Sequence, residues 1–217
     1  MKVVISGTSK GIGLKIAQKF LKENHEVIGL DILGSNIDDK NYTHYICDVR
    51  KKDCLPEVKD VEILVNNAGI QTNSIDDINV NLVGLINTTF KYAYQEKIKS
   101  VVNVASISGT NGSEFPYYAA SKGGVLSFTK NTALELAKYK ATVNSVSPGG
   151  VLTDSNNHIL NNSNLYEKVL KETLLNKWAT EDEIADLVYY LTVINKSITG
   201  QDIIIDNGEI TKANFIW

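Results

Sequence analysis

Short apolar, β-branched runs alternate with longer amphipathic segments along this 217-residue chain. The runs at 63–67, 101–106 and 202–206 (ILVNN, VVNVAS and DIIID) are apolar almost throughout, and polar residues do not alternate within them. That pattern is typical of parallel strands covered by helices on both faces. Strand, helix, strand, repeated along a chain, requires right-handed crossover connections. The sequence therefore predicts an α/β fold with a doubly wound parallel sheet of about seven strands and helices on both faces.

No internal repeat, low-complexity tract or linker divides the chain, and it contains only three prolines. Residues 1–217 are therefore expected to form a single domain. The predicted strands are Lys2–Ser6, Glu26–Asp31, Tyr42–Asp48, Val61–Asn66, Ser100–Ser106, Ala141–Ser147 and Asp202–Asp206. The predicted helices are Gly11–Glu23, Ile75–Glu96, Tyr118–Tyr139, Leu165–Leu175 and Thr180–Val193.

Composition argues against several classes of partner. The formal net charge is −3 and the isoelectric point is near 5.7, so no basic surface is expected for nucleic acid or an anionic membrane. No apolar run approaches the roughly 18 residues that cross a bilayer. Cys47 and Cys54 are too few for a disulfide framework and fit a reducing, cytoplasmic compartment. The histidines are scattered without metal-ligand spacing, so no metal site is expected.

A glycine-rich turn follows the first predicted strand and opens the first predicted helix. Gly7, Gly11 and Gly13 have the spacing G-x-x-x-G-x-G. Glycine is needed where the backbone turns tightly and approaches a pyrophosphate, and a helix N-terminus offers its N–H groups to the anion. Because glycines also end strands for structural reasons, the strand–turn–helix context decides the interpretation. The turn predicts a dinucleotide-binding site.

Two charged residues bear on which dinucleotide is bound. Asp31 ends the second predicted strand, 18 residues after Gly13, where a carboxylate accepts hydrogen bonds from the adenosine ribose and repels a 2′-phosphate. Lys10 precedes Gly11, and a cation there would attract a 2′-phosphate. Asp31 is expected to lie on the ribose itself and to dominate at contact distance. The sequence therefore favours NAD as the cofactor, with NADP as the alternative.

Further motifs follow the turn in a set order. They are CDV at 47–49, NNAG at 66–69, NLVG at 81–84, NVASISG at 103–109, YAASK at 118–122, SPGGVLT at 147–153 and ITGQDIIIDNG at 198–208. In this order the chain resembles the short-chain dehydrogenase/reductase family nearly end to end, with Ser6 where that family's glycine motif begins with Thr. The resemblance implies a Rossmann fold and an NAD(P)(H)-dependent oxidoreductase that interconverts a small-molecule secondary alcohol and a ketone.

The same resemblance implies the site residues. Asn81, Ser106, Tyr118 and Lys122 match the catalytic set: Lys122 would also hold the nicotinamide ribose, Ser106 the substrate oxygen, and Asn81 a water that links Lys122 to solvent. The turn and the resemblance together give the expected cofactor-binding residues, which are Gly7, Ser9, Lys10, Gly11, Ile12, Gly13, Asp31, Asp48, Val49, Asn67, Ala68, Gly69, Tyr118, Lys122, Pro148, Gly149, Val151 and Thr153.

Tyr118 and Lys122 are spaced i to i+4, which puts both side chains on one face of a helix. We expect Tyr118 to be the general acid in reduction and the general base in oxidation. A phenol has a reference pKa of about 10, and lowering it to about 7 takes about 4 kcal/mol, roughly what one ammonium at 4 Å supplies. Tyr117, which is rotated off the shared face, and Ser108, beyond the expected strand end, are the alternatives to Tyr118 and Ser106.

Three intervals are shorter than in the family. The interval 48–66 leaves little room for a full helix, and 66–81 predicts only a turn before the next helix. The step from Ser106 to Tyr118 is one residue short, which would displace the serine if the loop did not compensate. The later segment 153–178 is Asn-rich at first and then has spaced leucines, which predicts a polar loop and an amphipathic lid helix over the substrate.

Three functions stay open at this point. The first is the NAD-dependent dehydrogenase or reductase. The second is a 3-oxoacyl-[acyl-carrier-protein] reductase using NADPH, which the segment NKWATEDEIAD at 176–186 resembles, although Asp31 and the single arginine oppose it. The third is a non-catalytic nucleotide sensor, which only the shortened step before Tyr118 favours. The family resemblance also implies a homodimer or homotetramer that pairs the helices at 75–96 and 118–139.

Overall fold

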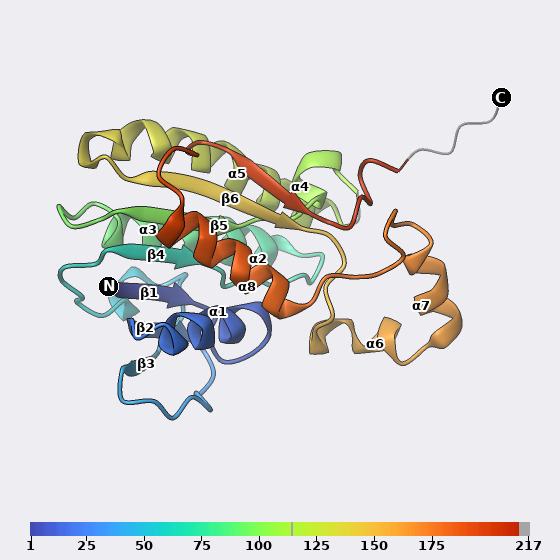
Figure 1. The fold of residues 1–217 in the computed structure, drawn as a ribbon, viewed down its shortest axis with the longest axis horizontal. Helices are drawn as coiled ribbons and strands as arrows, with labels where there is room; N and C mark the ends of the chain where they lie inside the picture. Colours follow the sequence, from blue (N-terminus) through green and yellow to red (C-terminus); the bar gives the residue numbers. More distant parts are fainter. Residues whose placement is uncertain (114, 213–217) are drawn as a thin grey trace.

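The computed structural model describes residues 1–113 and 115–212. Across these residues seven parallel strands form one sheet with the order β3-β2-β1-β4-β5-β6-β7, which confirms the predicted fold class (Figure 1). The strands are β1 (Lys2–Ser6), β2 (Glu26–Asp31), β3 (Tyr42–Ile46), β4 (Ile63–Asn66), β5 (Ser100–Val104), β6 (Thr142–Pro148) and β7 (Asp202–Ile205).

Helices connect the strands and cover both faces of the sheet (Figure 1). They are α1 (Gly11–Lys22), α2 (Ile75–Ile78), α3 (Leu85–Tyr92), α4 (Ser108–Asn111), α5 (Pro116–Leu136), α6 (Asn157–Leu160), α7 (Ser163–Leu170) and α8 (Glu181–Tyr189). The 3₁₀ turns are η1 (Lys52–Cys54), η3 (Ala137–Tyr139) and η4 (Asp154–Asn156), and the π-helical turns are η2 (Asn79–Gly84) and η5 (Tyr190–Ile194).

The hydrophobic core lies in two layers, one on each face of the sheet. On one face Ile16 and Phe20 of α1 pack with Ile184 of α8. On the other face Tyr92 of α3 packs with Leu136 of α5. Each fully buried side chain of this size stabilises the fold by roughly 1.5–3 kcal/mol relative to an exposed one. The apolar strands are therefore explained by burial on both sides.

The direction of the chain across the sheet reverses at β1. This strand pairs with β2 on one side and with β4 on the other, in parallel register throughout. Helices that leave such a point cross to opposite faces, which opens a crevice at the carboxyl ends of the central strands. The glycine-rich turn follows β1 directly and therefore lies at this crevice.

Several predicted boundaries need correction. The helix predicted over 75–96 is divided by η2 and ends at Tyr92. Strand β5 ends at Val104, before the predicted Ser106, because the chain turns into α4 at 108. The lid helix is α7 at 163–170 and not 165–175, because the Asn162 side chain accepts a hydrogen bond from the backbone N–H of Leu165 and so caps the helix earlier.

The two shortened intervals before residue 81 fold as predicted. Between β3 and β4 the described chain forms only the turn η1, and residues 67–74 form a loop that leads into α2. Farther along, α6 and α7 lie beyond the carboxyl ends of the strands, outside the two helical layers (Figure 1). In the part of the chain that the structure describes, no helix combines the length and apolarity needed to span a membrane.

A test of this architecture is the close approach of α1 to β1. A Cβ atom at Gly13 would lie 1.9 Å from the carbonyl oxygen of Gly7, whereas a Cβ at Gly34 would have nothing within 4 Å. We expect Gly13→Ala to lower the free energy of unfolding by about 3 kcal/mol or more, and Gly34→Ala to change it by less than about 1 kcal/mol. Urea unfolding of both variants measures this, and equal stability would contradict the packing described.

Candidate active site

The glycine-rich turn has the backbone geometry that its sequence predicts. Gly7 and Gly11 have φ angles of +77° and +62°, in the left-handed region where side chains other than glycine are strained. Gly13 is needed for a different reason, because its Cα faces the Gly7 carbonyl without room for a Cβ. The turn and the first turn of α1 therefore lie tightly against the end of β1.

Ser6 and Asn67 join the glycine-rich turn to the loop after β4. The Ser6 hydroxyl oxygen accepts hydrogen bonds from the backbone N–H groups of Asn67 and Ala68, at 3.0 and 3.1 Å. In return the Asn67 side-chain amide donates to the carbonyl oxygens of Ser6 and Gly7, both at 3.1 Å. The hydroxyl at position 6 therefore has a defined role, which explains why serine can stand in for threonine there.

A pocket of about 400 Å³ opens in front of the turn. Its lining residues come from the turn, the start of α1, the loop after β2, the first part of the lid segment and the start of α8. They are Ser9, Lys10, Gly11, Leu14, Asn36, Leu152, Thr153, Asp154, Asn157, Leu160 and Glu181. At the α1 N-terminus, Lys10 makes no side-chain capping bond and the first turn carries no acidic residue. A helix start in that condition suits the pyrophosphate of a dinucleotide.

Glu181 at the start of α8 is a lining residue that the sequence did not single out. Burial raises the pKa of its carboxyl group above the usual value, and Lys15 acts in the opposite direction. Its Oε1 atom lies 3.8 Å from where a Cβ of Gly11 would be. A carboxylate at this position would repel a phosphate, so Lys10 and the helix N-terminus must outweigh it for an anion to bind.

Asp31 lies at the carboxyl end of β2 and faces the turn. Its Oδ2 atom accepts from the backbone N–H of Ser9 at 2.9 Å, and its Oδ1 atom accepts from the backbone N–H of Leu33 at 3.0 Å. Each carboxylate oxygen can accept more than one hydrogen bond, so both retain capacity for a ribose hydroxyl. The side chain is thus held at the position where a ribose would be recognised.

Asp48 is engaged by the only arginine in the chain. Arg50 donates from Nε and Nη2 to the Asp48 carboxylate at 3.0 and 2.8 Å, and this guanidinium holds the pKa of that carboxyl below its usual value. Arg50 also lies 3.4 Å from Asp76 of α2. The charged residues 50–53 are all exposed, as in a solvated loop, and Arg50 nevertheless forms these ion pairs. The neighbouring Val49 is buried, and its side chain lies against Gly84 of η2.

The predicted catalytic residues on α5 and η2 come together beside the loop after β4. The Lys122 amine lies 5.7 Å from the centre of the Tyr118 ring, which confirms that the i to i+4 spacing places the two side chains together. A Cβ at Gly69 would lie 3.6 Å from Lys122 Nζ and 3.2 Å from Asn81 Oδ1. Tyr117 is 44% exposed, and Tyr118 is the more buried of the two tyrosines.

Lys122 is a buried amine. Its Nζ atom donates to the carbonyl oxygen of Val104 at 2.9 Å. Desolvation lowers the pKa of Lys122 from 10.5 to about 8. The amine therefore still carries its proton at neutral pH, but at a cost in folding free energy that a surface lysine would not have.

Asn81 is held by both ends of its side-chain amide. Its Oδ1 atom accepts from the backbone N–H of Ile70 at 2.7 Å, and its Nδ2 atom donates to the Ile70 carbonyl at 2.8 Å and to the Ser121 hydroxyl at 3.1 Å. The π-helical turn η2 carries this residue, and such turns are frequent at functional sites. In this structure Asn81 fixes the loop after β4 against the residue next to Lys122.

Ser106 and Ser108 lie together after β5, although their positions in the sequence suggested a choice between them. The Ser106 hydroxyl donates to the Ser108 hydroxyl at 3.3 Å and accepts from the Ser108 backbone N–H at 3.2 Å. Between them, the Ile107 N–H donates to the Pro148 carbonyl at 3.1 Å. The shortened step to Tyr118 is therefore taken up by α4 and the loop after it, and Ser106 stays buried.

The segment SPGGVLT continues from β6 toward the lid. Gly149 and Gly150 have no room for side chains, because a Cβ at Gly149 would meet Glu209 at 2.8 Å and one at Gly150 would meet the Trp178 ring at 2.2 Å. Val151 forms a bridge with Ala179, which closes the base of the lid. Thr153 lines the pocket described above. The structure thus brings the loop predicted to bind the cofactor to the same crevice as the turn.

Sequence reasoning missed three residues next to the turn: Thr8, Tyr42 and His44. They form a chain of hydrogen bonds that reaches Leu33. Strand β3 lies next to β2 in the sheet, and this pairing alone brings the residues together. Their spacing in the sequence carried no signal of it.

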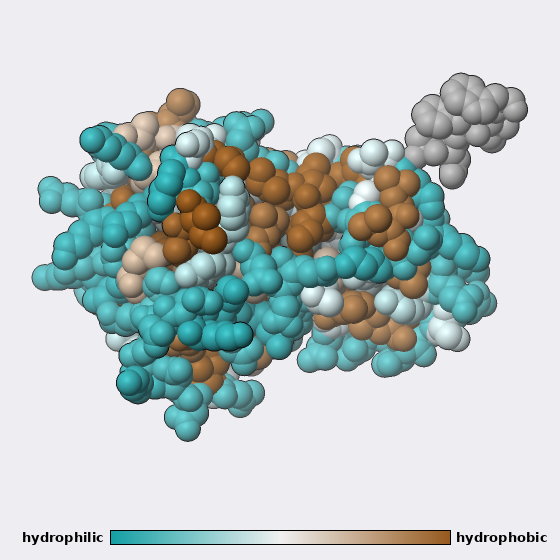
Figure 2. All heavy atoms as spheres, viewed as in Figure 1, coloured by the Kyte–Doolittle hydropathy of each residue, from teal (hydrophilic) through white to brown (hydrophobic). Residues whose placement is uncertain are grey.

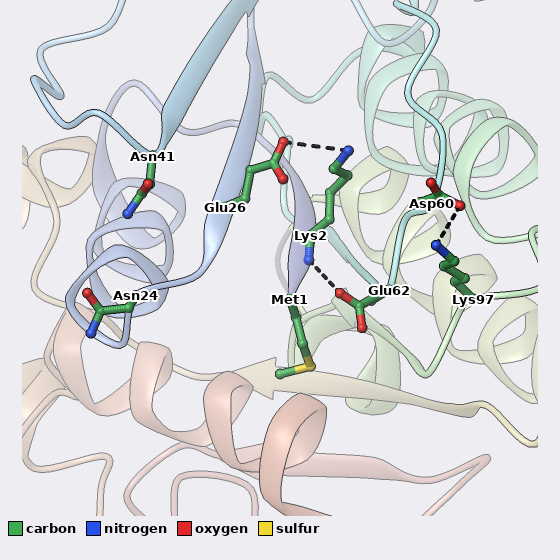
Figure 3. A pocket seen from close by; sticks show the side chains of 8 residues that line it. All are labelled: Met1, Lys2, Asn24, Glu26, Asn41, Asp60, Glu62 and Lys97. Atoms are coloured by element: carbon green, nitrogen blue, oxygen red, sulfur yellow. Dashed lines mark hydrogen bonds and ion pairs between the residues drawn. The ribbon is translucent and has the colours of Figure 1, made fainter.

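A second pocket, of about 580 Å³, lies at the opposite edge of the sheet. Its residues come from the amino ends of strands, and most are charged or amide side chains (Figure 3). Lys2 pairs with Glu26 through its side chain and with Glu62 through its backbone N–H, and Lys97 pairs with Asp60. Since these charges satisfy one another far from the turn, this pocket is not the candidate site.

Together, the parallel sheet and the crevice at its reversal point define a protein of the Rossmann class, in which dinucleotides bind at such a crevice. The chain belongs to the short-chain dehydrogenase/reductase family, and residues 7–209 match the family model described as enoyl-(acyl carrier protein) reductase. It is an enzyme of the oxidoreductase class that uses a nicotinamide dinucleotide.

Individual relatives cover almost the whole chain. It is 32% identical to the 3-oxoacyl-[acyl-carrier-protein] reductase FabG of Thermotoga maritima, over 94% of this chain and 96% of that protein. It is similar to 4-hydroxyisoleucine dehydrogenase complexed with NADH, with a TM-score of 0.89, 28% identity and coverage of 98% and 99% of the two chains. It is also similar to ElxO with NADP bound, with a TM-score of 0.85, 25% identity and coverage of 97% and 99%.

Lys122→Met tests whether the amine is buried with a lowered pKa. In the window between about 8 and 10.5 the folded protein has lost this proton while the unfolded chain retains it. Unfolding then takes up a proton, so the stability of the wild type rises with pH across the window. Methionine does not titrate, and the stability of the wild type relative to the variant should therefore increase between about pH 7 and about pH 10.

Urea unfolding at the two pH values measures the difference. Lys130→Met, at an exposed position on the same helix, is the matched control and should show no such increase. A flat difference for Lys122→Met would show that the amine is solvated and would remove this support for the site.

Proposed function

We propose that the protein is an NAD(H)-dependent enzyme that interconverts a secondary alcohol and a ketone, with Tyr118 as the general acid and base. The observation that carries the proposal is the buried Lys122 amine, 5.7 Å from the centre of the Tyr118 ring. For packing alone, an apolar side chain would suit that buried position better than a cation. It is explained by a neighbour that must become an anion during the reaction.

The magnitude of this interaction fits the task. With the 5.7 Å to the ring centre taken as the charge separation, an ammonium favours a phenolate by about 3 kcal/mol when the effective dielectric constant is about 20. That is a factor of roughly 10² in the population of the phenolate. Lys122 thus makes proton removal from Tyr118 feasible at neutral pH, where Lys122 itself stays charged.

The remaining residues support the proton transfer. In the family, a bound nicotinamide supplies the hydride, so the protein has to hold the substrate and move one proton. Ser106 would donate a hydrogen bond to the substrate oxygen as charge develops there. Asn81 holds the Ile70 backbone and Ser121, and so keeps the loop at Gly69 beside Lys122. Residues of the turn and of the 148–153 loop would hold the cofactor.

Asp31 supports NAD over NADP. Its Oδ2 atom is held by the backbone N–H of Ser9 in the turn and its Oδ1 atom by that of Leu33, which leaves the remaining lone pairs for the two ribose hydroxyls. A 2′-phosphate at the same place would meet the carboxylate charge at contact distance, where repulsion is several kcal/mol at an effective dielectric of about 20. Lys10 is exposed and lines the pocket in front of the turn.

A second candidate function is a 3-oxoacyl-[acyl-carrier-protein] reductase, which the name of the Thermotoga maritima relative favours. Carrier proteins are acidic, and docking one calls for a basic surface. The chain has a net charge of −3 and a single arginine, which is engaged by Asp48. The cofactor distinguishes the two candidates, because the reductase was expected to use NADPH.

We also propose that the protein forms a homodimer or homotetramer and that 153–178 is a substrate lid. Phe90 of α3 and Leu134 of α5 are 55% and 78% exposed, on the helices that would pair. Apolar side chains also gather beside α8 along the β7 edge, where Ile194 and Ile204 are exposed (Figure 2). Covering these side chains would remove apolar surface from water.

A cytoplasmic location stays a prediction.

Tyr118→Phe tests the proposed proton donor. Phenylalanine keeps the ring and removes the hydroxyl, so we expect kcat to fall by about 10²- to 10⁴-fold with little change in NADH affinity. The assay follows nicotinamide absorbance with a 3-oxoacyl thioester and with a set of sugar alcohols as probes. Tyr117→Phe is the matched control and should retain activity. The proposal fails if Tyr118→Phe stays active or if Tyr117→Phe does not.

Asp31→Asn tests the choice of cofactor. The substitution keeps the shape of the side chain and removes its charge, so repulsion of a 2′-phosphate is relieved and one ribose acceptor is lost. We expect the ratio of NADPH affinity to NADH affinity to rise by at least about tenfold, measured by titration of nicotinamide fluorescence. A wild type that prefers NADPH would instead favour the acyl-carrier-protein reductase.

A further inference from the structure

The loop after Asp31 has little packing to hold it. Ile32 is 65% exposed and Leu33 is 49% exposed, so neither side chain anchors the loop in the core. Its position next to the proposed ribose site therefore depends on hydrogen bonds to its backbone. These bonds converge on one residue, Leu33.

Both peptide groups of Leu33 are held. Its N–H donates to Asp31 Oδ1 at 3.0 Å. Its carbonyl oxygen accepts from the Ser9 hydroxyl at 3.2 Å and, at the shorter distance of 2.8 Å, from Nε2 of His44. His44 reaches this carbonyl from β3, across the neighbouring strand β2. The imidazole thus links the loop to β3, in addition to the bond from Leu33 to Asp31 of β2.

The donor and acceptor in each hydrogen bond between Thr8, Tyr42, His44 and Leu33 follow from the Leu33 carbonyl, which is the final acceptor. A carbonyl oxygen only accepts, so Nε2 of His44 carries a hydrogen, and in the neutral ring Nδ1 is then the acceptor. The Tyr42 hydroxyl, 2.9 Å from Nδ1, therefore donates to it. The Tyr42 oxygen in turn accepts from the Thr8 hydroxyl at 2.8 Å. The relay begins in the glycine-rich turn and ends at the loop.

The sheet leaves space for this relay at one position. Gly29 of β2 lies opposite His44 in the strand register. A Cβ at Gly29 would lie 2.1 Å from the Tyr42 hydroxyl oxygen and 2.5 Å from Thr8 Oγ1. Any side chain there would displace both hydroxyls. Glycine at position 29 is therefore required for the hydrogen bonds between Thr8, Tyr42 and His44.

We propose that His44 is a positioning residue for cofactor selection, which acts through Leu33 to keep the Asp31 carboxylate against the adenosine ribose. This inference rests on the proposed function. With the relay intact, Asp31 is held between Ser9 of the turn and Leu33 of the loop, and the 2′-phosphate position is closed. Without His44 the Leu33 carbonyl loses its shorter bond, the loop moves outward, and Asp31 loses its fixed orientation.

The test compares NADH and NADPH affinities of the purified full-length protein by fluorescence titration. His44→Phe keeps a ring but removes both nitrogens, and Tyr42→Phe removes only the hydroxyl that orients them. We expect each to weaken NADH binding by roughly three- to tenfold, the net worth of one hydrogen bond, with a smaller change for NADPH. His44→Gln, which can still donate to the Leu33 carbonyl, should recover most of the NADH affinity. Thr43→Val, at the exposed neighbour on β3, is the control.

The outcomes separate the two proposals. The inference stands if the NADH-to-NADPH affinity ratio falls in both phenylalanine variants and recovers in His44→Gln. It is overturned if the ratio is unchanged, or if both cofactors weaken equally, which would indicate a purely structural role; thermal unfolding without cofactor shows whether His44→Phe is folded. A wild type that binds neither dinucleotide overturns the proposed function and this inference together. If the wild type binds a dinucleotide and the variants bind NADH and NADPH with the same affinities as the wild type, only the inference is overturned.

Discussion

The contact between Gly13 and the Gly7 carbonyl is the constraint on which the rest of the site depends. It places the first turn of α1 directly at the end of β1, where the sheet reverses direction. Asn67 then reaches across to the same carbonyl and attaches the loop after β4. Because that loop carries Gly69 beside Lys122, the glycine-rich turn and the proposed proton-transfer residues share one framework.

The interior combines polar groups that cost stability with hydrogen bonds that offset the cost. Asn66 donates to Thr89 and to Asn103, both at 2.9 Å, and Asn103 donates to Thr129 at 2.9 Å. This buried network links β4, β5, α3 and α5 behind the Lys122 amine. A buried amine is unfavourable in such an interior, but here it is oriented by a neighbouring carbonyl and by fixed helices. The proposed chemical role of Lys122 would explain why this cost in stability is retained.

Local sequence signals predicted most elements and part of the site. Apolar runs marked central strands such as β4 and β5, because residues buried on both faces of a sheet show no polar alternation. The i to i+4 spacing predicted the Tyr118–Lys122 pair because helix geometry is local. Strand and helix ends were less well predicted: the cap at Asn162 and the turn into α4 are decided by single side chains and by neighbouring loops. The π-helical turn at Asn81 had no sequence signal.

The sequence alone predicted the fold class and the turn at 7–13, because both leave patterns that are local in the chain. The candidate catalytic residues came from the family resemblance of the motifs. The tertiary structure decided which distant groups meet. Ser6 contacts Asn67, Arg50 contacts Asp76, and His44 contacts Leu33 only after separate elements of the chain have packed together. Such contacts depend on strand order and register, which are set by the packing of the whole sheet and leave no periodic pattern in the chain.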